Sequence, residues 1–364
     1  MGTAERVRAR DLGIVSGMLP TGPANAITDV AGVTVGHTTI RRGAGALVRG
    51  VGPVRTGVTA ILAHGGDLFA SKVPASAEVF NGYGKSIGLM QIAELGQLES
   101  PIVLTNTLNV GKVADALVGW AIERHPAIGV TTATINPVVA ECNDGYLNDI
   151  GGRHVGEVET RAALDGARDG PVAEGNVGAG TGMSCYGWAG GIGTASRLVH
   201  TDGATWVLGA LVLANFGRAD DLLIAGVPVG RLLAAESNAA REYGSIVVVL
   251  ATDAPLDARQ LGRLARRVPH GLARTGSHGG HGSGDLALAF SVADRIAHYP
   301  QGPTRQTVTV DEGHPVLDAL FRATVETTEE SVLNALCAAT ATDGRDGHRR
   351  EALPHDRVRA FLQG

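Results

Sequence analysis

The sequence predicts a mixed α/β or α+β fold in which layers of β-sheet are covered by helices. Short apolar runs alternate with helical patterns in the first half, a cluster of strands occupies the middle, and the C-terminal part is helical. Helices before and after the strands can cover the apolar faces of a sheet. No linker rich in proline or serine divides the 364 residues, so we expect one structural unit over residues 1–364.

Two strands and one helix are predicted in the first half of the chain. The apolar runs at 58–63 and 102–106 have the length of buried strands. The stretch 113–124 places apolar residues at helical spacing and ends on basic residues just before Pro126.

The second half is predicted to hold a larger strand cluster. Strands are expected at 206–213, 222–224, 245–252 and 286–292. A helix is expected over 257–268, because Leu261, Leu264 and Val268 lie on one helical face. Either 202–203 or the polar segment 234–242, which leads to the third of these strands, is expected to be poorly ordered.

Two C-terminal helices are predicted, at 314–325 and 328–340. Thr327 and Glu330 have the spacing of a capping box, which would start the second helix.

The composition indicates a compact protein with small core side chains. Glycine contributes 52 residues and aromatic residues only 4%, while 44% of the chain is hydrophobic. The net charge of −5 is modest and basic residues are dispersed, so a nucleic-acid partner is not expected.

The cysteines and the N-terminus favour a cytoplasmic protein. Cys142, Cys185 and Cys337 are odd in number and widely spaced, which is typical of reduced thiols. The first residues lack the apolar stretch of a signal peptide, and no apolar run approaches the ~18 residues of a membrane span.

The dipeptide Gly244-Ser245 directly precedes the apolar run 246–250. A small residue followed by a hydroxyl residue at the start of a buried strand is what an N-terminal nucleophile hydrolase needs. Such an enzyme cuts its own backbone there, and the new terminal serine carries both a nucleophilic Oγ and a free α-amine. The same dipeptide is also common at ordinary turns.

The chain resembles the L-aminopeptidase/D-amidase-esterase family, also called DmpA-like enzymes or β-aminopeptidases. Matching segments occur in order at 27–37, 137–149, 178–183, 190–197, 214–217, 243–256, 271–276, 282–286, 344–348 and 353–357. The resemblance implies a four-layer α-β-β-α sandwich of the kind shared with ornithine acetyltransferase. It also implies cleavage at Gly244-Ser245 into chains 1–244 and 245–364, which remain associated, and a homotetramer of such heterodimers.

Two further polar residues are candidates for the catalytic centre. Ser283 and Asp285 lie two residues apart at the start of a predicted strand, so both side chains should point to one face. A hydroxyl and a carboxylate on one face can orient a proton near a nucleophile. The family uses a serine and an acid at these positions, and some relatives carry Glu where this chain has Asp285. Without the resemblance, the segment would equally be a turn.

Three candidates would contact the substrate. Asn215 follows a predicted strand and carries an amide donor that can stabilise an oxyanion, although such residues often cap turns. The resemblance places Tyr146 in the substrate pocket and Glu141 where an acid can hold the free amine of the substrate.

No cofactor or metal is expected. The glycine-rich segments at 178–182 and 190–193 lack the complete nucleotide-binding fingerprint. His278 and His281 have no third ligand nearby in the sequence, and no Gly-x-Ser-x-Gly elbow is present.

The sequence therefore predicts a self-processing serine aminopeptidase or amidase that acts on short peptides, amides or esters with a free amine. An acyltransferase on a related self-cleaving fold and an uncleaved, non-enzymatic binding protein remain as alternatives. The choice among L-amino-acid amides, D-alanyl esters and β-peptides stays open, because it depends on the shape of the pocket.

Overall fold

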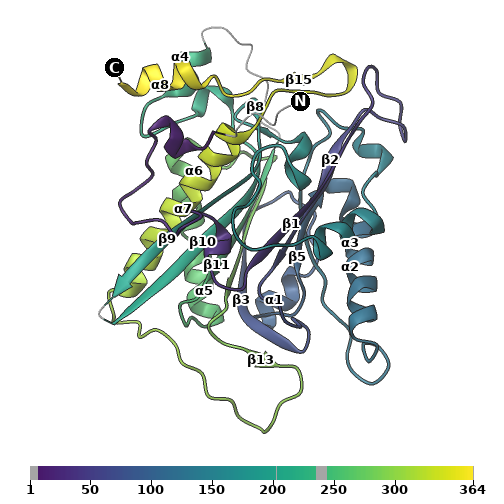
Figure 1. Ribbon diagram of the computed structural model, residues 1–364, viewed down its shortest axis with the longest axis vertical. Helices are drawn as coiled ribbons and strands as arrows, with labels where there is room; N and C mark the ends of the chain where they lie inside the picture. Colours follow the sequence, from purple (N-terminus) through teal and green to yellow (C-terminus); the bar gives the residue numbers. More distant parts are fainter. Residues whose placement is uncertain (1–6, 202, 235–243, 364) are drawn as a thin grey trace.

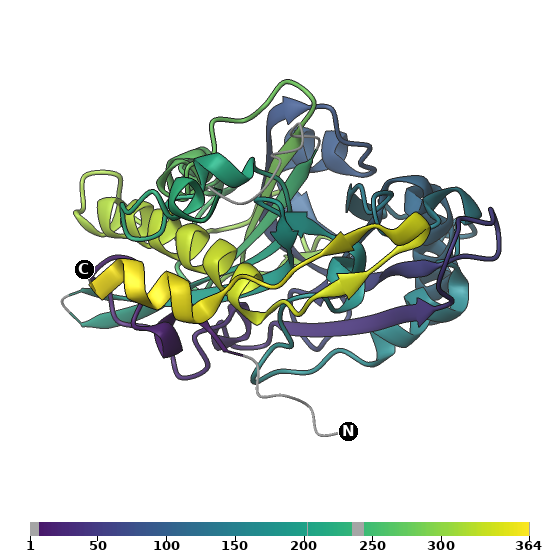
Figure 2. The ribbon, with the colours of Figure 1, turned by 90° about the horizontal axis from the view of Figure 1, so that it is seen from above.

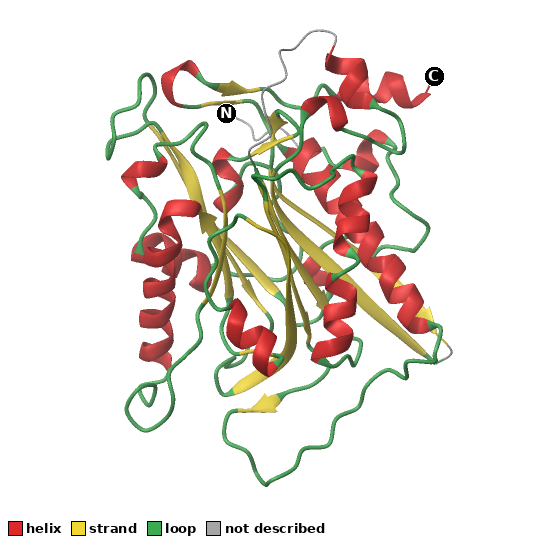
Figure 3. Cartoon of the chain, turned by 180° about the vertical axis from the view of Figure 1, so that it is seen from behind, coloured by secondary structure: helices red, strands yellow, loops and turns green. Residues whose placement is uncertain are grey.

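A computed structural model describes residues 7–201, 203–234 and 244–363 and arranges them in four layers (Figure 1). The two middle layers are β-sheets packed face to face, and helices cover the outer face of each sheet (Figure 3). The outer layers consist of α2 (Val110–Arg124) and α3 (Glu157–Asp165) on one side, and of α5 (Ala258–Ala265), α6 (Val268–Arg274) and α7 (Val316–Ala338) on the other. The predicted α-β-β-α sandwich is confirmed.

The smaller sheet has four strands and the larger sheet seven. In spatial order the smaller sheet contains β1 (Thr34–Arg42), β2 (Val54–Leu62), β5 (Ile102–Asn106) and β6 (Val138–Cys142). The larger sheet contains β13 (Ile296–Ala297), β3 (Ser71–Gly82), β12 (Gly284–Ser291), β11 (Ser245–Thr252), β10 (Ala204–Asn215) and β9 (Gly191–Thr201), with β4 (Gln97–Leu98) paired to β3. β11 runs parallel to β12 and antiparallel to β10, so it lies in the middle of the larger sheet.

Shorter elements complete the fold. The remaining α-helices are α1 (Leu89–Leu95), α4 (Val229–Ala234) and α8 (His355–Gln363). Two small sheets pair β7 (Ser184–Cys185) with β8 (Trp188–Ala189) and β14 (Thr342–Asp343) with β15 (Arg349–Arg350). The C-terminal segment with β14, β15 and α8 runs across the top of the molecule (Figure 2). Within the described ranges, no helix is long and apolar enough to cross a membrane.

Alternation along β11 divides the core and orients Ser245. Ile246, Val248 and Leu250 pack toward the helices of the larger sheet. Val247 and Val249 pack between the two sheets. Successive side chains of a strand point to opposite faces, so Ser245 faces the space between the sheets.

Most predicted elements are confirmed, with shifts of a few residues at their ends. The segment 222–224 is not a strand, because Ile224 forms only an isolated bridge with Val227 inside a turn. The predicted helix 257–268 is two helices, α5 and α6, separated at Arg266 and Arg267. Apolar spacing could not reveal this break, since residues of both helices pack into one core.

The prediction of two C-terminal helices is wrong, because α7 runs through without a break. Thr327 caps nothing, and its hydroxyl donates to the carbonyl O of Ala323 one turn earlier. Glu330 is fully buried and pairs with Arg10 and Arg197. These arginines come from distant segments, so tertiary partners give Glu330 its role, whereas Thr327 bonds within its own helix. Of the two segments predicted to be poorly ordered, Gly203 lies in the turn between β9 and β10 and Ala234 ends α4, while 202 and 235–242 lie outside the described residues.

Candidate active site

Three strand ends of the larger sheet meet at Ser245. Ser245 is the first residue of β11, its register partner on β10 is Asn215, and its partner on β12 is Gly284. Ser245 is 7% exposed and Asn215 4% exposed. The antiparallel and parallel pairings thus bring a hydroxyl, an amide and a backbone N–H to one end of the sheet.

The N–H of Gly284 lies against two oxygens of the Gly244-Ser245 segment. It donates to Ser245 Oγ at 3.1 Å and to the carbonyl O of Gly244 at 3.3 Å. A Cβ on Gly284 would lie 2.4 Å from the backbone N of Gly84, so a side chain there would displace the turn that follows β3. The absence of a side chain permits this close approach.

Ser283 and Asp285 contact each other beside β11. The Ser283 hydroxyl donates to Asp285 Oδ1 at 2.5 Å, and the N–H of Ile246 donates to the same oxygen at 3.2 Å. Both side chains lie on one face, as their spacing predicts. Asp285 lines a separate cavity toward the helices, together with Pro269 and Leu272.

Hydrogen bonds to both the oxygen and the nitrogen of its side-chain amide fix the orientation of Asn215. Its Oδ1 accepts from the N–H of Ser184 at 2.8 Å, and its Nδ2 donates to the carbonyl O of Asn143 at 2.9 Å. An amide nitrogen carries two protons, so one proton of Nδ2 is left for another acceptor. Asn215 is therefore a rigid donor beside Ser245.

A cavity of about 450 Å³ opens at Ser245 and combines five of the predicted site residues, Glu141, Tyr146, Asn215, Gly244 and Ser245. The other residues of its lining are Tyr83, Lys85, Thr107, Asn143, Ser184, Gly282 and Arg350. Its volume suits a small organic ligand.

Glu141 lies at the end of β6 and presents a buried carboxylate to this cavity. Its Oε1 accepts from the backbone N–H of Lys85 at 2.8 Å, and its Oε2 accepts from the hydroxyl of Thr107. Burial raises the pKa of Glu141, because a low dielectric disfavours the charged form, and the hydrogen bonds oppose this shift.

Tyr146 lies between two side chains of the C-terminal segment. Its ring stacks on His348 with centroids 4.4 Å apart, and the guanidinium of Arg350 lies 3.8 Å from its centroid. Nδ1 of His348 is 2.8 Å from the carbonyl O of Tyr146, which gives His348 a structural position.

Sequence reasoning missed several residues of the site. Thr107 follows the predicted strand 102–106 directly, and a polar residue at a strand end was a usable signal. Ser184 and Arg350 lie in short hairpins, and no local pattern marks them. The N–H of Gly284 is a backbone donor, which only the pairing of β11 with β12 reveals.

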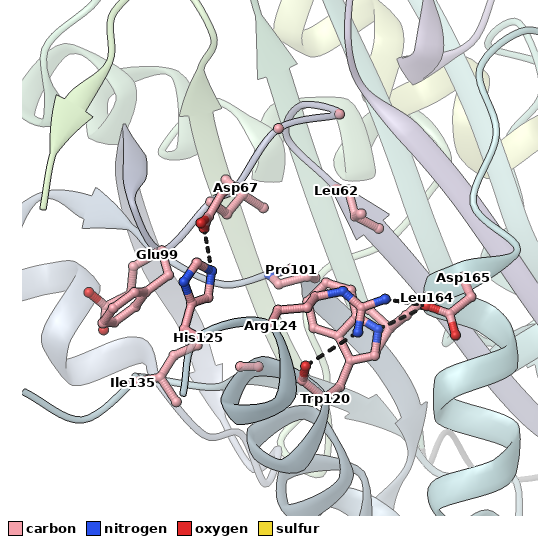
Figure 4. A pocket seen from close by; sticks show the side chains of 15 residues that line it. Leu62, Asp67, Glu99, Pro101, Trp120, Arg124, His125, Ile135, Leu164 and Asp165 are labelled. Carbon is pink, nitrogen blue, oxygen red and sulfur yellow. Dashed lines mark hydrogen bonds and ion pairs between the residues drawn. The ribbon is translucent and has the colours of Figure 1, made fainter. Parts of the chain in front are cut away.

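A second cavity, of about 460 Å³, lies between α2 and the segment that joins β2 to β3 (Figure 4). Its charged groups are all paired: His125 contacts Asp67 at 2.6 Å, Arg124 contacts Asp165 at 2.8 Å, and Glu99 pairs with Lys72. No serine or cysteine is among the described residues that line it. This cavity lacks a nucleophile, so the cavity at Ser245 is the candidate active site. The described residues include no cluster of three side chains that could hold a metal ion.

Comparisons with known proteins agree with this geometry. Residues 25–350 match the sequence model of Peptidase family S58. The chain belongs to this family. It is 43% identical over 379 residues to "Beta-peptidyl aminopeptidase BapA" of Sphingosinicella microcystinivorans, an alignment that covers 99% of this chain and 93% of the relative.

Solved structures show the same fold. A protein of Pyrococcus horikoshii OT3 superposes with a TM-score of 0.94 at 48% identity, covering 98% of this chain and 99% of that protein. The L-aminopeptidase D-Ala-esterase/amidase of Ochrobactrum anthropi, described as a variant of the Ntn hydrolase fold, gives a TM-score of 0.89 at 43% identity, and the match covers 98% of each chain. The predicted family, fold and hydrolase class are confirmed.

Proposed function

We propose that this protein is a self-processing serine aminopeptidase that hydrolyses short peptides, amides or esters with a free N-terminal amine, with Ser245 as its nucleophile. One observation carries the proposal. At the buried start of β11, the N–H of Gly284 lies against both Ser245 Oγ and the carbonyl O of Gly244. The attacking oxygen and the carbonyl to be cut are thus held by one donor, which supports a reaction between them.

In the proposed self-cleavage, Ser245 Oγ attacks the carbonyl carbon of Gly244. The C–N bond between the two residues breaks, the hydroxyl proton ends on the released amine, and an ester remains. Water then hydrolyses this ester, giving chains 1–244 and 245–364. The fragments would stay together, because β11 pairs with β10 and β12 pairs with β3 across the cut.

In the proposed turnover, the free α-amine of Ser245 is the general base. Its ordinary pKa of about 7.7 to 8.0 suits proton transfer near neutral pH. The amine takes the proton of Oγ as Oγ attacks the substrate carbonyl, and it returns that proton to the leaving amine. Water then frees the acyl group from Oγ, and Asn215 Nδ2 stabilises each oxyanion.

The other polar residues would position these groups. Asp285 accepts from the N–H of Ile246, next to the new terminus, and with Ser283 it would orient the α-amine. Glu141 would hold the substrate's ammonium through a charge-assisted contact. Names of the relatives, "Beta-peptidyl aminopeptidase" and "L-aminopeptidase D-ala-esterase/amidase", support this substrate class.

The assembly and the location are part of the proposal. We infer a homotetramer of cleaved heterodimers in the cytoplasm. The buried, unpaired thiols of Cys142, Cys185 and Cys337 support a reducing compartment.

Intact-mass analysis with N-terminal sequencing tests the proposal. Dividing 37.3 kDa in the ratio 244:120 gives fragments of about 25 and about 12 kDa, the smaller beginning Ser-Ile-Val-Val. Ser245→Ala should leave one intact chain, while the control Ser76→Ala, a partly buried serine of β3, should be cleaved normally. A single intact chain in folded, active wild-type protein would overturn the mechanism. Transfer of the acyl group to an added amine, in place of hydrolysis, would indicate an acyltransferase.

A further inference from the structure

The active-site cavity carries a cation that the proposed mechanism does not use. Arg350, in β15, lines the cavity, and its guanidinium lies over the Tyr146 ring at 3.8 Å from the centroid. Its Nε donates to Ser184 Oγ at 2.9 Å, which fixes the plane of the guanidinium.

Arg350 differs from its neighbour in its charge partners. Arg349 forms ion pairs with Asp343 and Glu351, both at 2.6 Å. Among the described residues, no carboxylate pairs with Arg350, and burial lowers its pKa because the cation has lost part of its water. The N–H groups of its two Nη atoms can donate side by side to the two oxygens of a carboxylate. A half-buried, oriented cation that has no carboxylate partner among the described residues is suited to an anionic ligand.

The two charged ends of the cavity lie on opposite sides of Ser245. Arg350 contacts Ser184, which donates to Asn215 on β10. Glu141 lies on the β12 side: it accepts from Lys85, and a Cβ on Gly84 would be 3.7 Å from Glu141 Oε1 and 3.6 Å from Gly284 Cα. Because β11 lies between β10 and β12, a substrate that crosses Ser245 would meet an acid at one end and a cation at the other.

We propose that Arg350 binds the carboxylate of the leaving residue, so that the preferred substrates are zwitterionic dipeptides. This inference rests on the proposed aminopeptidase function and adds the identity of the leaving group. The ammonium would lie at Glu141, the carbonyl carbon at Ser245 Oγ and the terminal carboxylate at Arg350. Arg350 is thus a specificity-determining residue for the leaving side.

Matched substrates test this assignment. The first step is to find an amino acid whose aromatic amide the processed enzyme cleaves. The carboxyl group of this amino acid is then joined to glycine in one substrate and to glycinamide in the other. These two substrates differ only in the terminal carboxylate. Wild type should prefer the glycine substrate by about 10- to 100-fold in kcat/KM, the range of a charge-assisted contact. Arg350→Met should reduce this ratio to near one, whereas Arg349→Met should keep it.

The ratio separates failure of this inference from failure of the proposed function. A general loss of activity in Arg350→Met affects both substrates and cancels in the ratio. If the aromatic amide is cleaved but wild type shows no preference, or Arg350→Met retains it, the role of Arg350 is overturned and the aminopeptidase function stands. If processed wild-type enzyme cleaves neither an aromatic amide of any amino acid tested nor the glycine and glycinamide substrates, both are overturned.

Discussion

Replacing Gly244 by alanine is expected to slow self-cleavage by about 100-fold. A Cβ on Gly244 would lie 2.1 Å from the carbonyl O of Asn215 and 2.7 Å from Phe216 Cα, and both atoms belong to the backbone. Contact distances for a Cβ start near 3.0 Å, so the backbones at Gly244 and Asn215 must move apart by about 0.9 Å (3.0 minus 2.1 Å). A displacement of about 1 Å between reacting groups costs about 100-fold in rate.

Cell-free synthesis with a short pulse of label measures this rate. The loss of the 37.3 kDa chain on a denaturing gel gives a first-order constant, independent of protein concentration because the reaction is intramolecular. Gly111→Ala is the matched control, since a Cβ there meets nothing within 4 Å. Circular dichroism must show that Gly244→Ala is folded. A folded Gly244→Ala chain that cleaves as fast as wild type would refute the claim that this contact positions the carbonyl.

Two further predictions concern ionisation. Burial raises the pKa of Asp144 to about 7, so the folded state holds this proton more tightly than the unfolded state does. Its contribution to stability is therefore present below about pH 4 and is lost as the pH rises to about 7. In Asp144→Asn, the free energy of unfolding should fall by about 2 to 4 kcal/mol less over this pH range than in the wild type. Urea titration at several pH values measures this difference. A pH dependence equal to that of the wild type would contradict the raised pKa of Asp144. Asp285→Asn removes a negative charge beside the α-amine of Ser245 and so should lower the amine pKa, moving the acid limb of the kcat/KM profile down by about one pH unit. If the acid limb of the kcat/KM profile lies at the same pH in Asp285→Asn and in the wild type, Asp285 does not act on this amine.

The buried strands were the easiest elements to predict. β5 and β11 have the bounds that their apolar runs predict, because both faces of these strands are covered and polar residues are excluded from most positions. β1 was missed, since its outer half is exposed and polar residues interrupt the apolar pattern. The segment 222–224 shows the opposite error: it is apolar because it packs in the core, although it forms a turn.

The site was predictable only in part. Ser245 and Asn215 follow from a strand start and a strand end, each within a segment that resembles the family. The spacing of Ser283 and Asp285 predicted their contact, yet it could not show that Asp285 reaches the N–H of Ile246. That contact depends on the register between β11 and β12.

The sequence by itself determined that a hydroxyl stands at the start of a buried strand behind a glycine, because strand patterns and the Gly244-Ser245 dipeptide are local. Only the tertiary structure decided what surrounds that hydroxyl. It brings the N–H of Gly284 to Ser245 Oγ, and it places Glu141 and Arg350 on opposite sides of β11. These groups come from distant segments, and their meeting depends on sheet pairing and on the path of the C-terminal segment, which no local pattern encodes.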